Sequence, residues 1–250
     1  MAPSAEPTAD LSTLPNADGS ATFSYGGYTV TAAVNGPIEA QRRDENPFEA
    51  FVDVNVRPAA GVGGTAERQL ESILQPALRQ LIPIRNFPRS MIQITLQVTE
   101  TPENAYANTK LVQAQLNLGI LPALLHASIL GLLTAAIPLK SIATAVTLAI
   151  PSADDGSIAI DPSTRDAETA KSVHVLGFTS GHELLLAESQ GSFTVEDWDK
   201  ILEAGQRVCC QPEGQDIDTA MAGSGLESAS IKAFLRSAME TKIAGDLHWK

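Results

Sequence analysis

The sequence predicts a mixed α/β fold, a single domain in which mixed sheets pack on helices around one central buried apolar helix. Two patterns predict it. FVDVNVRP, from residue 51, and MIQITLQV, from residue 91, alternate apolar and polar residues as half-buried strands do. Other segments repeat apolar residues at helical spacing. The order strands, helix, strand, helix, strands, helix is typical of one compact mixed domain.

The chain begins with a segment, residues 1–14, that predicts a flexible lead. A hairpin follows. Asp18-Gly19 is a turn signal, Gly26-Gly27 separates two β-rich runs, and Gly36-Pro37 is expected to end the second run.

The first helix is predicted over residues 65–82, with Thr65 as its N-cap. Its apolar face carries Leu70, Ile73, Leu74, Ala77, Leu78 and Leu81. Pro76 inside it is expected to kink or shorten the helix. After the next strand, the polar residues from Thr101 to about Lys110 predict a loop.

Residues 121–139, LPALLHASILGLLTAAIPL, carry no charge and have the length of a membrane span. Pro122 and Pro138 bracket them, however, and neither a basic flank nor an aromatic belt is present. Small residues recur at every fourth position: Ala123, Ala127, Gly131 and Ala135. This pattern favours a helix buried on both sides, with a membrane anchor as the alternative.

The second half predicts a meander of strands over residues 141–150, 157–161, 172–179 and 183–189. A helix follows, in which Thr194 and Asp197 form a capping box. The main domain is placed at 15–210. The remainder, 211–250, is expected to be an extension with a short amphipathic helix whose stripe comprises Ile231, Phe234, Leu235 and Ala238.

The net charge of −12 argues against a free-standing nucleic-acid binder, because phosphate contacts require clustered Lys and Arg. Cys209 and Cys210 are adjacent, which predicts free thiols in a reducing compartment. The start of the chain lacks a secretion signal.

No catalytic motif is persuasive from the residues alone. Asp154-Asp155-Gly156 is typical of a turn, GVGG at 61–64 is a weak glycine cluster, and no metal-ligand spacing is present. The residues therefore indicate an acidic, soluble, intracellular α/β domain, with no metal and no cofactor expected.

Five short motifs nevertheless occur in a familiar order: DGSATF at 18–23, NGP at 35–37, VRPAAG at 56–61, FPRS at 87–90 and IAIDPST at 158–164. With the apolar helix ending in AAIPL, this order resembles the RNase PH family over about residues 15–210. The family includes nucleases that use inorganic phosphate to cleave the 3′-terminal nucleotide of RNA.

The resemblance implies a site from which key residues are missing. The family's phosphate-binding Arg, in the turn that opens the apolar helix, aligns with Ile120, and the nearest cation in the sequence is Lys110. Asp161 is kept, but the second acidic position falls on Ala167, next to Asp166. The site is therefore expected to be inactive, because Arg supplies the strong bidentate bonds to phosphate.

The similarity is greatest to a subunit of the eukaryotic RNA exosome, which implies a structural role. The implied partners are the other RNase PH-like subunits of a hetero-hexameric ring, cap subunits, a hydrolytic nuclease, and single-stranded RNA in the channel. Arg57, Arg68 and Arg89 are candidate RNA or partner contacts, with ordinary surface cations as the alternative. The edge strands and the 65–82 helix are candidate interfaces.

The implied location is the nucleus and nucleolus, and also the cytoplasm. An active phosphorolytic nuclease with a diverged or partner-completed site is the main alternative. A metabolic enzyme is a further one, because a fold does not determine a function.

Overall fold

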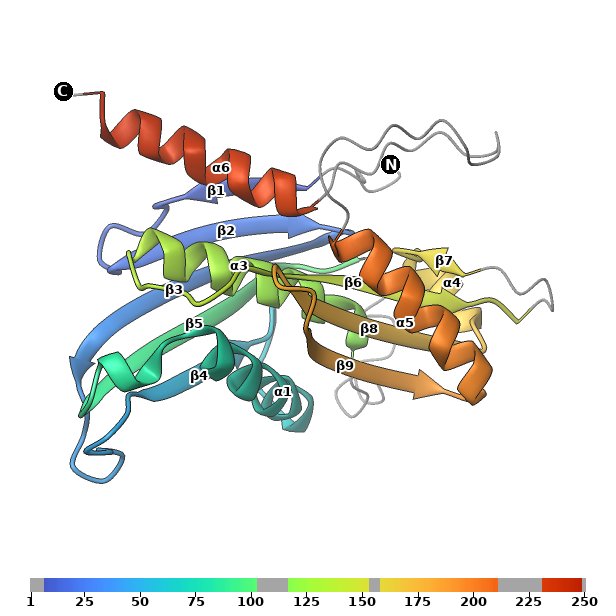
Figure 1. Ribbon diagram of the computed structural model, residues 1–250, viewed down its shortest axis with the longest axis horizontal. Helices are drawn as coiled ribbons and strands as arrows, with labels where there is room; N and C mark the ends of the chain where they lie inside the picture. Colours follow the sequence, from blue (N-terminus) through green and yellow to red (C-terminus); the bar gives the residue numbers. More distant parts are fainter. Residues whose placement is uncertain (1–6, 103–116, 153–157, 211–230, 249–250) are drawn as a thin grey trace.

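The computed structural model describes residues 7–102, 117–152, 158–210 and 231–248. Its strands are β1 (Thr8–Leu11), β2 (Gly19–Tyr25), β3 (Tyr28–Glu39), β4 (Phe51–Arg57), β5 (Ser90–Glu100), β6 (Ala143–Ile150), β7 (Ala159–Ile160), β8 (Ser172–Thr179) and β9 (Leu184–Gly191). Its helices are α1 (Thr65–Leu81), α3 (Leu121–Thr134), α4 (Thr164–Thr169), α5 (Val195–Cys210) and α6 (Ile231–Asp246). The predicted mixed α/β fold is confirmed (Figure 1).

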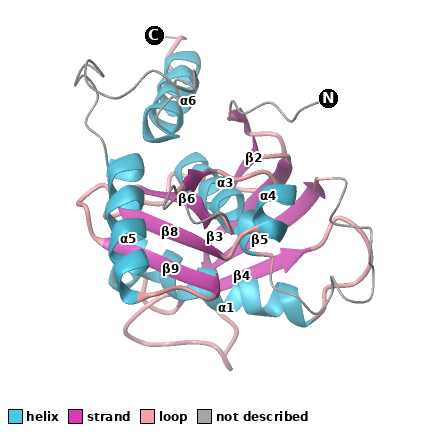
Figure 2. Ribbon diagram, turned by 90° about the vertical axis from the view of Figure 1, so that its right-hand side faces the viewer, coloured by secondary structure: helices cyan, strands magenta, loops and turns pink. Residues whose placement is uncertain are grey.

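The strands form two sheets, ordered β1-β2-β3-β5-β4 and β7-β6-β8-β9. Helix α3 packs against β2 and β3 of the first sheet and against β6 of the second. On β6, Ala145 belongs to the core that contains α3, whereas Val146 and Leu148 belong to a second core with Ile201 of α5. The layers are therefore first sheet, α3, second sheet and α5 (Figures 1 and 2).

The first sheet departs from the sequence prediction at both ends of its opening hairpin. Thr8–Leu11, placed in the lead, pairs with β2, because β2 would otherwise be an open edge. Strand β3 does not end at Gly36-Pro37 but continues to Glu39. A register shift between Asn35 and Ile38 leaves Gly36 and Pro37 without partners in β5, so the missing N–H of Pro37 costs no ladder bond.

Helix α1 runs over Thr65–Leu81, as predicted, but Gly64 is its N-cap and Thr65 is its first residue. The backbone N–H of Gly64 donates to Oε2 of Glu67 at 2.6 Å, which supplies the cap that the sequence assigned to Thr65. Pro76 does not interrupt the helix. The burial of leucines 70, 74, 78 and 81 stabilises it across the bond that proline removes.

Every residue of α3 from Leu121 to Leu132 is buried, which confirms the predicted core helix. A Cβ on Gly131 would lie 3.0 Å from Val34 Cγ2 and 3.3 Å from Ala32 Cβ, so the small stripe is where β3 approaches the helix. Over the described residues, no helix is both long and apolar enough to cross a bilayer.

The predicted capping box of α5 is present. The Thr194 N–H donates to Asp197 Oδ2 at 3.1 Å, and the Asp197 N–H donates to Thr194 Oγ1 at 3.2 Å. Helix α6 docks through Leu235, which is 1% exposed, and through Phe234, whose ring centroid lies 6.2 Å from that of Phe23. The loop predicted over 101–110 and the turn at Asp154-Asp155 fall almost wholly outside the described residues.

Candidate functional site

A pocket of about 470 Å³ opens where the β2–β3 turn, the start of α3 and the segment from β7 to β8 meet. Its wall combines apolar and polar side chains, and it contains two of the three degenerate positions named from the sequence. The lining residues used below are Tyr25, Tyr28, Leu118, Gly119, Pro122, Ala123, Asp161, Ala167, Glu168, Lys171 and Ser172. This position and this mixture of groups make it the candidate site.

Asp161 directly follows β7, and its backbone has a φ of +48°, in the left-handed region. Its carboxylate accepts a hydrogen bond from the Tyr25 hydroxyl and a longer one, at 3.4 Å, from the Thr147 N–H of β6. Burial raises the pKa of Asp161, and these two bonds oppose the rise. The retained acid therefore ties β2 to the edge of β6.

Ile120 precedes α3 and is 4% exposed, with its side chain in the main core. The pocket wall beside it consists of Leu118, Gly119, Pro122 and Ala123. Among the described residues, no side chain caps the N-terminus of α3, and Pro122 lacks one of the N–H groups that an anion would use there. At the predicted phosphate position, this chain thus presents an apolar wall.

Ala167 lies in the pocket, as the sequence alignment on IDPST implies. It belongs to the six-residue helix α4, which Ser163 caps by accepting from the Asp166 N–H at 3.3 Å. Asp166 is exposed and is not among the residues that line the pocket. Its carboxylate instead accepts a hydrogen bond from the Ser163 hydroxyl at 2.6 Å. The acid that α4 places there is Glu168.

Lys171 is a pocket residue that the sequence analysis missed. Among the described residues it is the one cation in the lining, and its Nζ lies 3.6 Å from Asp197 Oδ2 at the start of α5. Lys110, named from the sequence as the nearest cation, lies outside the described residues. No local sequence pattern links residue 171 to residue 120, so only the fold shows that Lys171 lies in the pocket beside the start of α3.

Tyr28 shapes the opposite wall. Its hydroxyl lies 3.2 Å from Oδ1 and 3.1 Å from Nδ2 of Asn117, and either amide atom can be the partner. A Cβ on Gly119 would lie 3.3 Å from the same hydroxyl, so glycine lets the tyrosine approach the turn before α3. This contact closes the pocket on the β3 side.

Ser172 raises the question of a nucleophile, because its Oγ lies 2.9 Å from Nε2 of His174. However, Ser172 is 1% exposed, and Nδ1 of His174 contacts Ser189 Oγ at 2.8 Å rather than a carboxylate. Burial lowers the pKa of His174. Ser172 and His174 are buried and hydrogen-bonded, Ser189 is exposed, and this cluster lacks the carboxylate that would complete a hydrolytic triad.

Comparison of the chain with known protein families gives a match over its first half. The model described as the 3′ exoribonuclease family, domain 1 (RNase PH), matches residues 6–138, more than half of the chain. The chain belongs to the RNase PH family. The resemblance seen in its short motifs is thereby confirmed.

Among RNase PH relatives, the exosome complex component RRP46 of Saccharomyces cerevisiae is 33% identical over 80% of this chain and 89% of its own length. The crystal structure of rice (Oryza sativa) Rrp46 covers 94% of both chains at 24% identity, with a TM-score of 0.74. A chain of the Archaeoglobus fulgidus exosome, solved with RNA bound to the active site, has a TM-score of 0.63 at 14% identity, over 81% of this chain and 84% of its own.

The RNase PH fold separates the three predicted contact arginines. Arg57 is the last residue of β4 and lies opposite Gln97 of β5. Gln97 pairs with Thr31, close to the β2–β3 turn that borders the pocket, so Arg57 lies at the pocket end of the sheet. Arg68 is exposed on the first turns of α1. Arg89 precedes β5 at the opposite end, where its Nε lies 3.5 Å from Glu45. Their contacts with RNA or a partner stay predictions.

Within the described part of this RNase PH chain, no group of three or more His, Cys, Asp or Glu side chains is arranged to hold a metal ion. Cys209 and Cys210 are free and buried. Burial raises the pKa of the Cys209 thiol to about 12, so it stays protonated at neutral pH.

Proposed function

We propose that this chain is a non-catalytic structural subunit of the RNA exosome core ring, which supports 3′-to-5′ processing and degradation of RNA, including ribosomal RNA. Its partners would be other RNase PH-like subunits, cap subunits and a hydrolytic nuclease, with single-stranded RNA passing through the channel. The similarity to yeast RRP46, named an exosome complex component, over 89% of that protein supports this role.

The observation that carries the non-catalytic part is the position of Ile120. The family resemblance places the phosphate-binding Arg there, and this chain has a residue that is 4% exposed within the core. Asp161 accepts hydrogen bonds from Tyr25 and Thr147, and the methyl side chain of Ala167 cannot act as an acid or a base. A phosphate dianion in this pocket would lack the arginine fork that makes such binding strong.

A phosphorolysis assay tests the proposal. The purified chain, alone and within a reconstituted ring, is incubated with oligoadenylate and inorganic phosphate, beside a phosphorolytic RNase PH protein as positive control. We expect no release of nucleoside diphosphate above the rate without protein. Phosphate-dependent shortening that disappears on Asp161→Asn would overturn the non-catalytic assignment.

One observation favours the alternative of a diverged active site. Lys171 lines the pocket and is 45% exposed, so a phosphate could displace Asp197 from it. Under that alternative, Lys171→Met abolishes phosphorolysis, whereas Lys200→Met, on the exposed part of α5, leaves it unchanged. Under our proposal neither variant has an activity to lose.

For location, the proposed role implies the nucleus and nucleolus, and also the cytoplasm, where exosome-dependent RNA processing takes place. A fluorescent fusion, expressed at the native level, is expected to label nucleoli most strongly. Exclusion from the nucleus would contradict this part of the proposal.

A further inference from the structure

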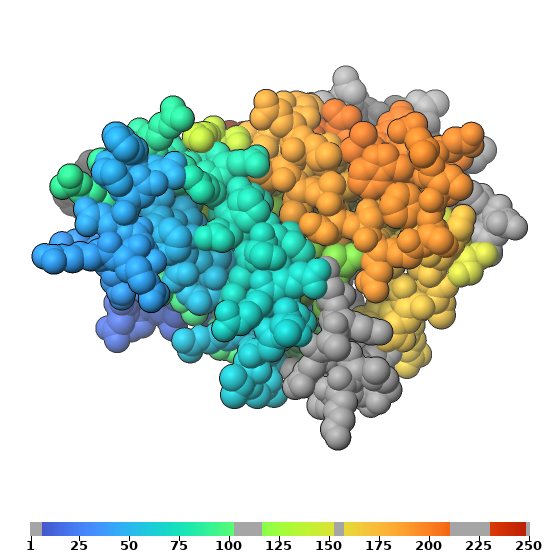
Figure 3. All heavy atoms as spheres, turned by 90° about the horizontal axis from the view of Figure 1, so that it is seen from below, coloured from blue at the N-terminus to red at the C-terminus, as the bar shows by residue number. Residues whose placement is uncertain are grey.

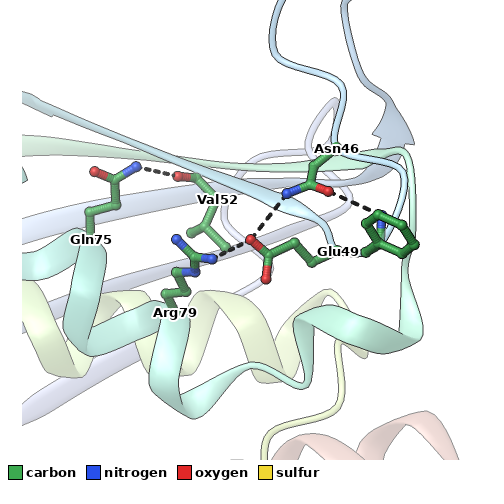
Figure 4. Close-up of polar contacts among 6 residues, drawn as sticks. Asn46, Glu49, Val52, Gln75 and Arg79 are labelled. Carbon is green, nitrogen blue, oxygen red and sulfur yellow. Dashed lines mark hydrogen bonds and ion pairs between the residues drawn. The ribbon is translucent and has the colours of Figure 1, made fainter.

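Phe48 is 81% exposed, the most exposed aromatic side chain among the described residues. It lies in the loop between β3 and β4, and that loop is held by specific contacts. The Phe48 N–H donates to Asn46 Oδ1 at 3.1 Å, and Asn46 Nδ2 donates to Glu49 Oε1 at 3.2 Å. Arg79 of α1 forms an ion pair with the same Glu49 oxygen (Figure 4).

Two further backbone bonds fix the loop at its ends. The Arg89 N–H donates to the Asn46 carbonyl at 3.0 Å, and the Ala50 N–H donates to the Ile84 carbonyl at 2.9 Å. Phe48 is thus a large apolar group presented to solvent by an ordered backbone. Binding through it would lose little conformational entropy, because the loop is already arranged.

Beside this loop, and sharing Glu49 with it, is a hollow of about 630 Å³ at the C-terminal part of α1, which we name the α1 hollow. Arg79, Arg85 and Lys140 line it, and Glu49 is its one acidic residue. Arg85 and Lys140 are exposed and form no ion pair with any residue in the described ranges. In a chain of net charge −12, this hollow is locally positive.

We propose that Phe48 and the α1 hollow form one docking surface for a neighbouring ring subunit, an inference that rests on the proposed function. The surface fits a partner that presents an apolar pocket for the phenyl ring, with carboxylates placed to reach Arg85 and Lys140. A buried aromatic anchor next to Arg is the usual composition of an interface hot spot.

The observations favour a protein over RNA as the occupant. Phe48 is a single aromatic residue, whereas single strands stack on successive aromatic side chains. Asp44, Glu45 and Glu49 share its loop, and each is ion-paired with an arginine: Arg43, Arg89 and Arg79 respectively. These three arginines are therefore engaged within the chain and less available to phosphates than free cations would be. On a protein interface, the same charges form a polar rim around an apolar centre.

The test measures the affinity of this chain for the ring subunits, each purified separately, by titration followed with native mass spectrometry. We expect Phe48→Ser to weaken assembly at least about 30-fold, as loss of a hot-spot aromatic does. The double variant Arg85→Glu, Lys140→Glu is expected to weaken it about 10-fold or more, because it places like charges opposite the partner's carboxylates.

Matched controls are Val62→Ser, at a residue that is 92% exposed before α1, and the double variant Arg165→Glu, Lys200→Glu, which makes the same charge change elsewhere. Both are expected to assemble like the unmodified chain. Urea unfolding midpoints of all variants are expected to stay unchanged, since every substituted side chain is exposed.

Several results would overturn the inference. If Phe48→Ser assembles as well as the unmodified chain, Phe48 is not an anchor. If the control variants lose as much affinity as the test variants, the effect is not specific to this surface. If the variants lose affinity for a fluorescent 20-nucleotide oligoadenylate while assembly is unchanged, the occupant is RNA. If they only dissociate a homodimer in sedimentation, the occupant is a second copy. Failure of the unmodified chain to enter any ring would instead refute the proposed function.

Discussion

The Nε2 atom of His126, in the middle of α3, accepts a hydrogen bond from the backbone N–H of Ala145 in β6 at 3.0 Å. Strand β7 pairs only with Leu148 and Ala149, so it does not reach this part of the β6 edge. The imidazole and, two residues further along, the Asp161 carboxylate take the place of the missing strand. Two titratable side chains therefore complete a backbone ladder.

This role predicts a pH-dependent stability. Burial lowers the pKa of His126 to about 3 from an ordinary value near 6.5. Between these values the unfolded chain binds more protons, so the free energy of unfolding falls as the pH falls from about 6.5 to about 3, by up to about 1.4 kcal/mol per pH unit.

His126→Gln tests this, because the amide oxygen can accept from Ala145 without titrating. Urea unfolding at a series of pH values is expected to show the variant less stable at neutral pH but less sensitive to acid. Asp161, whose pKa is raised, contributes the opposite slope in both proteins and so cancels from the comparison. Parallel curves for the two proteins would contradict the assignment.

Tyr25→Phe is expected to destabilise the fold by about 1.5–3 kcal/mol, the usual contribution of a hydrogen bond to a charged group. The variant leaves the partly buried carboxylate of Asp161 with only the longer bond from Thr147. Chemical denaturation measures the loss. Tyr28→Phe is the matched control, since it removes a bond to the neutral Asn117 and should cost only about 0.5–1.5 kcal/mol. A larger loss in the control would refute the argument.

Gly19→Ala is expected to cost more than about 3 kcal/mol or to prevent folding. A Cβ there would lie 2.3 Å from Ala135 N and 2.5 Å from the Gly131 carbonyl oxygen, and these backbone atoms cannot rotate away. The contact fixes the start of β2 against the end of α3. Gly245→Ala, with open space around it on α6, should be neutral or stabilising. Thermal unfolding of both variants checks the contrast.

The outer edge of β4 predicts an aggregation phenotype. Gln75 Nε2 donates to the Val52 carbonyl at 2.8 Å, and the Val56 N–H donates to Glu71 Oε1 at 2.9 Å. Two side chains of α1 thus occupy backbone groups that a foreign strand would need. Glu71→Ala with Gln75→Ala is expected to increase self-association, measured by light scattering over hours at 37 °C. Gln69→Ala, exposed on the same helix, should not change it.

Much of the fold was predictable because its signals are local. Alternation over residues 51–57 and 91–98, and the uncharged run from residue 121, each arise from burial that repeats with one period. The errors occur where tertiary context decides. Residues 8–11 carry no strong strand pattern and become a strand because β2 offers an edge, and β3 passes Pro37 because a register shift accommodates it.

The candidate site was predictable only in part, and for the same reason. Asp161 and Ala167 were found through a motif, and both line the pocket. Lys171 and Glu168 were missed, because the segment from α4 to β8 brings them to the start of α3 from about 50 residues away in the sequence. The partner of Asp161, Tyr25, lies 136 residues distant, and no spacing rule connects the two.

Helix α1 lies along β4 and also contacts β9, so it occupies the space between an edge of each sheet (Figure 3). Pairing through an added strand uses only backbone groups, which are the same in every homologous chain. Related chains could therefore substitute for one another at such an edge. Because side chains of α1 occupy the border of β4, recognition at that edge has to depend on residue identity. A chain with this design can therefore occupy one specific position in an assembly of homologous subunits.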